Sequence, residues 1–268
     1  MQNAKTAKTA LITGASGGIG LELARVFAAA GYQLFITARR TDQLEALATE
    51  LRSGGTTVQV FPCDLTDRAA VRSLFRSVQE TGIPVDVLVN NAGFGDHGEF
   101  VVAKPEKLVD MIELNVTALT YLTRLVLPGM VERRSGRILN VASVASFQPG
   151  PLMAVYYATK SYVLSLSEAL AEELSPSGVT VTALCPGPTA SGFQEEAGLT
   201  QVPFYQKVKM PSSRVVAEYG YRAAMRGKRV AVHGTLFRVS IFFLRFMPRR
   251  LVTATVRRLQ ERRRPHPP

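Results

Sequence analysis

Tyr156 and Lys160 are the two residues whose types and spacing point most directly to chemistry. Residues four apart share a face of a helix, so this spacing places an ammonium group beside a phenol. The positive charge favours the phenolate and lowers the pKa of the tyrosine from its usual value of about 10. A tyrosine tuned in this way can exchange a proton with a substrate oxygen. Ser143, thirteen positions upstream, adds a hydroxyl to the same candidate set.

A glycine-rich turn at residues 13–20 stands near the start of the chain, with Gly14, Gly18 and Gly20. In such a turn, bare backbone amides and the following helix N-terminus can bind a pyrophosphate. An ordinary tight strand-to-helix turn could carry the same glycines, but the position directly after the first strand favours a nucleotide site. A nucleotide cofactor bound there could exchange a hydride while Tyr156 exchanges the proton. The two features predict an oxidoreductase acting on alcohols and carbonyls.

Arg39 and Arg40 follow the second predicted strand, where an enzyme that uses NAD carries an acid for the ribose hydroxyls. The first acid here is Asp42. Two guanidinium groups suit the 2′-phosphate of NADP, although a solvated pair of arginines is the alternative. The sequence therefore predicts NADP(H) as the preferred cofactor over NAD(H).

Strand-like and helix-like segments alternate along the chain, which predicts an α/β fold. Right-handed crossovers between parallel strands then give a Rossmann-type doubly wound sheet of about seven strands, with helices on both faces and ligands beyond the strand carboxyl ends. The expected strands are 9–12, 33–37, 57–61, 85–89, 136–141, 179–184 and 229–232. The expected helices are 21–30, 42–51, 66–80, 105–134 and 152–174.

These motifs together resemble the short-chain dehydrogenase/reductase family over almost the whole chain. The matching segments are the 13–20 turn, residues 63–65, residues 90–93, Asn115, Ser143, Tyr156 with Lys160, and residues 186–189. The resemblance implies one Rossmann-type domain over residues 1–247, with a substrate loop at about 186–213. It further implies hydride transfer between a nicotinamide cofactor and a small-molecule substrate, in a homodimer or homotetramer.

The resemblance also assigns roles to individual residues. The implied catalytic residues are Asn115, Ser143, Tyr156 and Lys160. Tyr156 would be the acid or base, Lys160 would lower its pKa and hold the nicotinamide ribose, and Ser143 would bind the substrate oxygen. Asn115 would hold a water linked to Lys160, and Tyr157 is interpreted as a packing or pocket residue. The implied cofactor contacts are Gly14, Ser16, Gly18, Ile19, Gly20, Arg39, Arg40, Asp64, Leu65, Asn90, Ala92, Gly93, Tyr156, Lys160, Pro186, Gly187 and Thr189. Asp96 and His97 are expected in a loop near the mouth of the site, without a catalytic role.

The charge of the chain is concentrated at its end. The net charge is +11, and residues 228–268 hold eleven Lys and Arg against the single acid Glu261. The body is nearly neutral, which argues against nucleic-acid binding. Cys63 and Cys185 are the only cysteines and show neither metal spacing nor a disulfide framework, so we expect no metal and a reducing, cytoplasmic location. We expect no signal peptide and no membrane-spanning helix.

The basic end, residues 248–268, is expected to be a partly disordered tail. Just before it, residues 235–247 predict an apolar helix, and Leu251, Val256 and Leu259 form a weaker apolar stripe among arginines. This pattern suits peripheral contact with an anionic membrane, at the inner membrane surface. A helix packed over the pocket or across a subunit contact explains it equally well.

Two other functions compete with the carbonyl and alcohol oxidoreductase. A sugar-nucleotide epimerase also uses a tyrosine and a lysine four apart, but the glycine spacing and the length of 268 residues count against it. A catalytically silent NADP sensor or scaffold would tend to have lost Tyr156 or Lys160. Phe94, Phe147, Met153 and Phe193 suggest an apolar pocket for a fatty acyl, steroid-like or other lipophilic carbonyl compound.

Overall fold

The computed structural model describes residues 7–261, and its centre is a seven-stranded sheet. All strand pairs are parallel, in the order β3-β2-β1-β4-β5-β6-β7. The strands are β1 (Thr9–Thr13), β2 (Gln33–Ala38), β3 (Val58–Pro62), β4 (Val87–Asn90), β5 (Gly136–Val141), β6 (Val179–Cys185) and β7 (Val230–Val232). The order reverses between β1 and β4, which confirms the expected doubly wound sheet and places a ligand crevice at that point.

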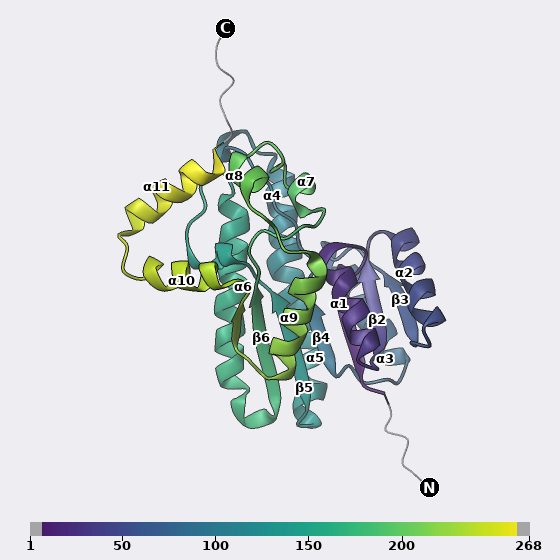
Figure 1. Cartoon of the computed structure of the whole chain (residues 1–268). Coiled ribbons are helices and arrows are strands. Elements are labelled where there is room, and N and C mark those ends of the chain that lie inside the picture. The colour runs from purple at the N-terminus through teal and green to yellow at the C-terminus, as the bar shows by residue number, and fades with distance from the viewer. Residues whose placement is uncertain (1–6, 262–268) are drawn as a thin grey trace.

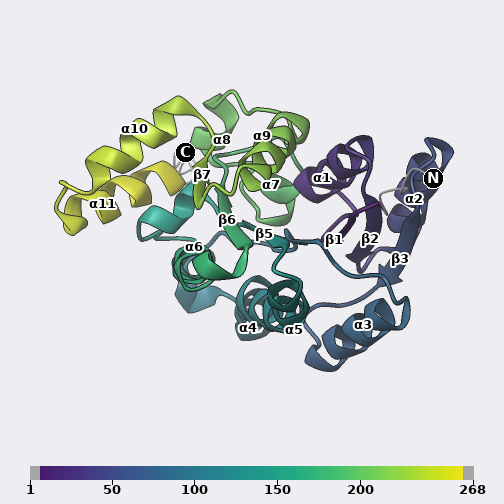
Figure 2. The same ribbon diagram turned by 90° about the horizontal axis from the view of Figure 1, so that it is seen from below.

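Helices cover both faces of the sheet (Figures 1 and 2). The long helices are α1 (Gly18–Ala29), α2 (Thr41–Ser53), α3 (Arg68–Glu80), α4 (Pro105–Ile112), α5 (Leu119–Glu132), α6 (Ala154–Glu173), α9 (Ser213–Met225), α10 (Thr235–Leu244) and α11 (Arg249–Gln260). The short ones are η1 (Phe100–Val102), η3 (Val144–Phe147), η4 (Ser175–Ser177), α7 (Phe193–Glu196) and α8 (Pro203–Lys207). On one face α1, α2 and α9 pack on the strands, and on the other face α3, α5 and the end of α6 do so. The strands are buried on both sides, which explains their nearly continuous apolar sequences.

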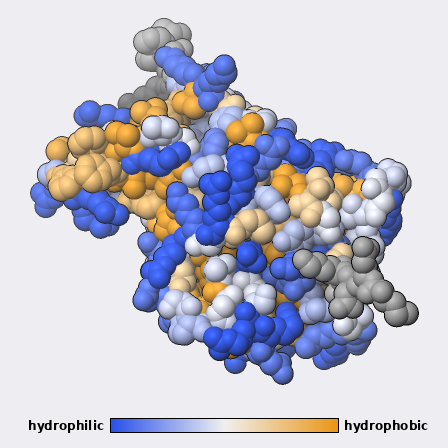
Figure 3. Space-filling view, turned by 60° about the horizontal axis from the view of Figure 1, so that its bottom comes forward, coloured by the Kyte–Doolittle hydropathy of each residue, from blue (hydrophilic) through white to orange (hydrophobic). Residues whose placement is uncertain are grey.

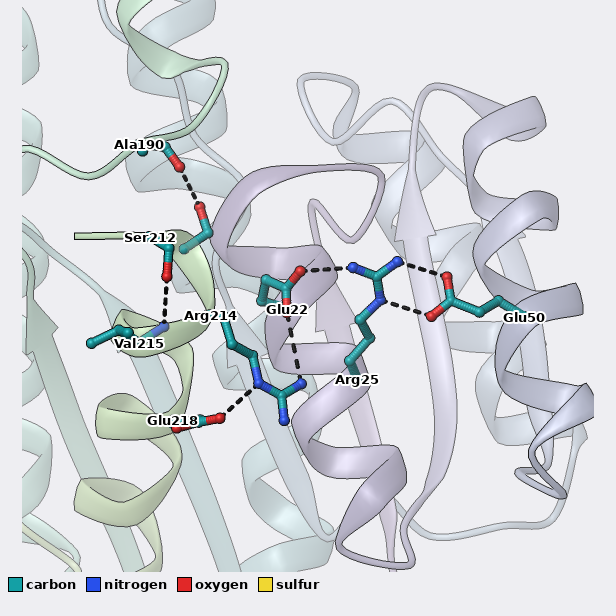
Figure 4. Close-up of polar contacts among 9 residues, drawn as sticks. Glu22, Arg25, Glu50, Ala190, Ser212, Arg214, Val215 and Glu218 are labelled. Atoms are coloured by element: carbon teal, nitrogen blue, oxygen red, sulfur yellow. Dashed lines mark hydrogen bonds and ion pairs between the residues drawn. The ribbon is translucent and has the colours of Figure 1, made fainter. Parts of the chain in front are cut away.

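Ion pairs join the three helices of the first face (Figure 4). Arg25 of α1 donates to both carboxylate oxygens of Glu50 on α2, at 2.7 and 2.8 Å, and to Glu22 at 2.7 Å. Arg214 of α9 pairs with Glu218 at 2.7 Å and lies 3.7 Å from Glu22. These partly exposed contacts add little stability singly and mainly fix how α1 meets its neighbours.

Helix α9 is the one long element of the body that the sequence pattern did not reveal. Its signal was present: the Ser212 side chain caps the helix by accepting from the Val215 backbone N–H at 3.4 Å. The buried positions Val216, Ala217 and Gly220 are small, so the apolar stripe is weak in sequence although the packing is close. A Cβ atom on Gly220 would lie 2.6 Å from a methyl group of Leu184, which shows how near the helix approaches β6.

Residues 105–134 were expected to form one helix; the observed helix runs from Pro105 to Glu132 and is interrupted by a π-helical segment, η2 (Glu113–Ala118). By length and composition alone, this stretch passes as a membrane-spanning helix, contrary to the sequence expectation that none would. Helices that pack in a protein core meet the same criteria, and Leu122, Val126 and Met130 are buried against the sheet.

The C-terminal segment differs from the expected tail. Residues 249–260 form α11, which turns back from the end of α10 toward the body, at an angle to α10, and packs Val252 and Val256 there (Figures 1 and 2). A separate tail starting at residue 248 is therefore wrong for this part of the chain, because its two valines are buried against the substrate side of the domain. The expected disorder of residues 262–268 concerns a segment outside the described residues.

Candidate active site

A cavity of about 990 Å³ opens beyond the carboxyl ends of the strands. Its floor is formed by the turns that follow β1, β2, β3, β4, β5 and β6, together with the start of α6. Most of the predicted site residues line it: Gly14, Ser16, Gly18, Ile19, Arg39, Arg40, Asp64, Leu65, Ala92, Gly93, Ser143, Tyr156, Lys160, Pro186, Gly187 and Thr189. Gly20, Asn90 and Asn115 are the predicted residues that do not.

The glycine turn has the backbone shape that its sequence suggested. Gly14 and Gly18 adopt positive φ values of +66° and +55°, which other residues rarely do. A Cβ atom on Gly20 would overlap the carbonyl oxygen of Gly14 and the amide of Asn91. Gly20 therefore allows α1 to begin close to strand β1, and its predicted contact with the cofactor stays a prediction.

Two neighbouring asparagines stand at the end of β4, and only Asn91, for which no role was predicted, lines the cavity. The Asn90 side chain is buried in the core, where it donates to Thr123 and to Asn140, each at 2.9 Å. Asn91 faces the cavity instead, and its amide donates to the carbonyl oxygens of Thr13 and Gly14 at 2.9 and 3.2 Å. Successive residues of an extended segment point to opposite faces, so the two asparagine side chains lie on different sides, and the predicted cofactor contact of Asn90 stays a prediction.

Arg39 and Arg40 are exposed at the rim of the floor. The guanidinium of Arg40 donates to the Ser16 hydroxyl at 3.2 Å and lies 3.4 Å from where a Cβ of Gly17 would be. Asp42 does not line the cavity. The rim therefore offers positive charge and a hydroxyl, without a carboxylate, next to the glycine turn.

Ser143, Tyr156 and Lys160 converge on the middle of the floor. Lys160 is 6% exposed, donates to the Val141 carbonyl at 2.8 Å, and lies 5.9 Å from the centre of the Tyr156 ring. Ser143 accepts from the Ala145 backbone at 3.1 Å as the cap of η3. Figure 1 shows α6, which carries the tyrosine and the lysine, running beside β6.

A short turn ties the serine to the lysine. The hydroxyl of Ser146 accepts from the Ser143 backbone at 3.3 Å and donates to the Lys160 carbonyl at 2.7 Å. The position of Ser143 relative to α6 is thus set by hydrogen bonds within the protein.

The pKa of Tyr156 departs from the sequence expectation. Burial raises the pKa of its phenol well above the usual range, and the Ser143 hydroxyl opposes this only in part. Burial also lowers the pKa of the Lys160 ammonium to about 8. The loss of solvent therefore outweighs the lowering of the tyrosine pKa that was expected from Lys160, because burial disfavours both charged forms. At neutral pH the tyrosine is a neutral phenol, ready to donate a proton.

Asn115 lies in the π-helical segment η2, a kind of turn that is often found at functional sites. Its side chain accepts from the Phe94 N–H at 3.1 Å and donates to the Phe94 carbonyl at 3.0 Å and to Thr159 at 3.1 Å. A Cβ on Gly93 would lie 2.8 Å from the Asn115 oxygen and 3.4 Å from the Lys160 ammonium nitrogen. Asn115 therefore stands behind the lysine, and its role in holding a water stays a prediction.

Helices α10 and α11 form the roof of the cavity, which the sequence offered only as one of two alternatives. Its cavity-facing residues are Leu236, Phe237, Ser240, Ile241, Leu244, Met247, Val252, Thr255, Val256, Leu259 and Gln260. A Cβ on Gly187 would overlap the Phe237 ring, so the roof rests directly on the loop after β6. The cavity thus joins a polar floor to a largely apolar roof.

Gln260 closes the far end of the roof and was not predicted as a site residue. It is 3% exposed, and its amide donates to the hydroxyls of Tyr157 at 2.9 Å and Tyr205 at 3.2 Å. The backbone carbonyl oxygen of Gln260 lies 2.8 Å from the Nε2 atom of His97. This contact agrees with the expected place of His97 near the mouth of the cavity. Tyr157 is confirmed as a pocket residue.

The described part of the chain has no cluster of three or more His, Cys, Asp or Glu side chains that could hold a metal ion. The floor does suit a dinucleotide, since a glycine turn with room above it, a positive rim and Asp64 all face the same cavity. The residues present therefore fit a nicotinamide cofactor.

Known proteins share these features. Residues 8–201 match the family model of the short chain dehydrogenases. Nodulation protein G of Rhizobium sp. (strain N33) is 34% identical over 241 residues, which cover 86% of this chain and 97% of that protein. A short-chain dehydrogenase from Sphingobium yanoikuyae, solved in complex with NADPH, is 34% identical with a TM-score of 0.80 and covers 89% of this chain and 94% of that chain. The bulky-bulky ketone specific alcohol dehydrogenase from Comamonas testosteroni is 30% identical with a TM-score of 0.77, over 89% and 92% of the two chains. The chain is an oxidoreductase of the short-chain dehydrogenase family.

Proposed function

We propose that this protein is an NADPH-dependent reductase that converts a bulky, apolar ketone to the secondary alcohol. The observation that carries the cofactor choice is the rim of the floor, where Arg40 contacts Ser16 and no acid lines the cavity at the end of β2. Arginine pairs with phosphate through parallel hydrogen bonds, and a carboxylate at this position would repel the 2′-phosphate.

The reaction adds a hydride to the carbonyl carbon of the substrate and a proton to its oxygen. The hydride comes from the reduced nicotinamide when the cofactor is bound. Tyr156 gives its phenolic proton to the oxygen as the carbon–oxygen double bond becomes a single bond. Because burial keeps this phenol protonated, it is the acid of the reduction rather than a resting phenolate. Oxidation of the alcohol reverses both transfers.

The other two residues of the floor stabilise the charge that grows on the oxygen. Ser143 donates a hydrogen bond to it, an interaction that strengthens as the oxygen becomes more negative. Lys160 adds positive charge 5.9 Å from the centre of the tyrosine ring, where its ammonium is already fixed by the Val141 carbonyl. Both groups are positioned before the reaction, so little reorganisation is needed during it.

The roof supports an apolar substrate. Leu236, Ile241, Leu244, Val252 and Val256 face the cavity, and the ring of Phe193 lies 5.2 Å from that of Tyr156. A substrate oxygen held at the tyrosine would therefore have hydrocarbon surface around the rest of the molecule. The similar alcohol dehydrogenase from Comamonas testosteroni is specific for bulky-bulky ketones, which agrees with a large apolar pocket in this fold. We also propose a homodimer or homotetramer, as the family resemblance implies.

Titration of the purified protein with NADPH and NADH tests the cofactor assignment. We expect NADPH to bind at least about tenfold tighter, which corresponds to about 1.4 kcal/mol. Arg40→Asp should weaken NADPH by more than tenfold while changing NADH by less. Arg76→Asp is the matched control, because this exposed arginine of α3 does not line the cavity and the change in net charge is the same. Tighter binding of NADH by the unaltered protein would overturn the assignment.

A further inference from the structure

Helix α10 has two apolar faces, and only one of them lines the cavity. The inner face includes Leu236, Phe237, Ser240, Ile241 and Leu244. The outer face carries Val239, Phe242 and Phe243, which do not line the cavity and remain exposed; Phe246, just after the helix, and Leu251 of α11 join them. We call these five side chains the outer apolar surface. No residue of α10 is buried, although it is among the most apolar helices of the protein.

The outer apolar surface is contiguous. The ring of Phe242 lies 5.6 Å from that of Phe243 and 5.5 Å from that of Phe246, both nearly edge to face. Phe246 is 72% exposed and Phe243 is 58% exposed. Figure 3 shows this surface as a hydrophobic patch over the two helices, which project from the body of the molecule. A patch of large apolar side chains on a projecting element marks an interaction surface.

The charge around this surface selects the partner. Helices α10 and α11 and the turn between them carry only positive charges, at Arg238, Arg245, Arg249, Arg250, Arg257 and Arg258, and their residues are largely exposed. Residues 235–260 include no Asp or Glu, and within the described part of the chain Arg257 alone among the six pairs with an acid, Glu261 at 3.1 Å. Self-association through this face would bring two such sets of arginines together. An anionic surface complements them.

We propose that α10 and α11 dock on an anionic lipid bilayer, with the phenylalanines at the boundary of the acyl chains and the arginines at the phosphates. A helix of ten residues is too short to cross a bilayer but long enough to lie in its surface. The inner faces of the same helices roof the cavity, so docking places the pocket against the membrane. If the proposed ketone reductase function holds, the substrate is a carbonyl compound dissolved in the lipid.

Co-sedimentation of the full-length protein with vesicles tests docking without any use of the activity. Vesicles of phosphatidylglycerol and phosphatidylcholine should sediment the protein at low salt, and pure phosphatidylcholine vesicles should sediment far less. Raising the salt should weaken binding several-fold without abolishing it, because screening acts on the arginines and leaves the burial of the phenylalanines unchanged. Protein that stays in the supernatant at low salt with anionic vesicles would overturn the proposal.

Two sets of variants separate the apolar and the charged contributions. The triple variant Phe242→Ser, Phe243→Ser, Phe246→Ser should lose at least about tenfold in vesicle binding at every salt concentration. Its matched control is Val109→Ser, Val131→Ser, Val215→Ser, which removes exposed apolar side chains from α4, α5 and α9. The variant Arg249→Glu, Arg250→Glu should lose mainly the salt-dependent part, and Arg72→Glu, Arg76→Glu on α3 serves as its control. NADPH titration of each variant confirms that the fold is intact.

Two further readouts keep this proposal distinct from the proposed function. Size-exclusion chromatography of the triple phenylalanine variant should show an unchanged oligomeric state, and a smaller oligomer would assign the surface to a contact between copies instead. A ketone dissolved in vesicles should be reduced several-fold more slowly by this variant, while a water-soluble ketone should be reduced at the unaltered rate. Failure to reduce any ketone would refute the proposed function and leave the vesicle-binding result standing.

Discussion

The floor and the roof of the cavity are held in place by different kinds of interaction. At the floor, three polar residues are held by neighbours in the fold: Lys160 by Val141, Ser143 by Ser146, and Asn115 by Phe94. The roof rests on apolar contacts of Val252 and Val256 and on the hydrogen bonds of Gln260 at one end. The floor suits chemistry that demands fixed geometry, whereas the roof suits the recognition of shape. Changes in the floor should therefore affect turnover, and changes in the roof should affect the choice of substrate.

The largest expected effect comes from removing Tyr156, the proton donor of the floor. Tyr156→Phe keeps the ring and deletes the proton, so kcat for ketone reduction should fall by at least about 100-fold. NADPH affinity should remain nearly unchanged by titration. Tyr162→Phe, on an exposed part of the same helix, is the control and should retain full turnover. Near-normal turnover of Tyr156→Phe would show that another group supplies the proton.

The buried Lys160 of the floor should change how the free energy of unfolding depends on pH. Its pKa is lowered to about 8 in the folded protein, from about 10.5 when unfolded. Between these values the unfolded chain binds more protons, so this group makes the fold more stable as the pH rises through that range. Relative to Lys160→Met, the unaltered protein should gain about 2 kcal/mol in free energy of unfolding between pH 8 and 10.

Urea unfolding of both cofactor-free proteins at several pH values measures this difference. Because Tyr156 and Cys185 are present in both proteins, their own titrations largely cancel in the comparison. If the free energies of unfolding of the two proteins changed in parallel between pH 8 and 10, Lys160 would not be desolvated as the structure has it.

A smaller effect is expected at Gln260, whose hydrogen bonds hold the end of α11 on the body. Gln260→Ala leaves the hydroxyls of Tyr157 and Tyr205 without their donor, at a cost of about 1–3 kcal/mol if no water replaces it. The end of α11 should loosen, so KM for a bulky ketone should rise several-fold with little change in kcat or in NADPH affinity. Steady-state kinetics measure this split, with Gln79→Ala of α3 as the control. An equal fall in kcat for large and small ketones would place Gln260 with the floor instead.

The floor was largely predictable from the sequence because its signals are local. The positive φ of Gly14, the four-residue spacing of Tyr156 and Lys160, and the arginines after β2 all depend on short segments. Two features of the floor could not be inferred from short segments. Whether the side chain of Asn90 or that of Asn91 faces the cavity depends on one step of strand register and on the packing of α5. The pKa of Tyr156 depends on burial, which no spacing in the sequence reveals.

The roof was not predictable to the same degree because its contacts join distant parts of the chain. Gln260 reaches Tyr157 across 103 positions of sequence, and Gly187 meets Phe237 only after α10 has folded back. The apolar stripe of 251–259 was visible, but a stripe among arginines is equally compatible with a membrane, a subunit or the protein's own body. Helix α9 was missed because small residues carry its packing.

The contact between Gly187 and Phe237 sets a limit on how this enzyme could be re-engineered. No side chain fits at position 187 while the ring of Phe237 stays in place, so the junction of roof and floor cannot be widened there. Ser240 and Leu244 also face the cavity, and changing their size does not disturb that junction. Libraries that vary these roof positions should alter which ketones are accepted while leaving the proton-transfer machinery untouched. The same geometry gives related chains a route to diverge in substrate without losing catalysis.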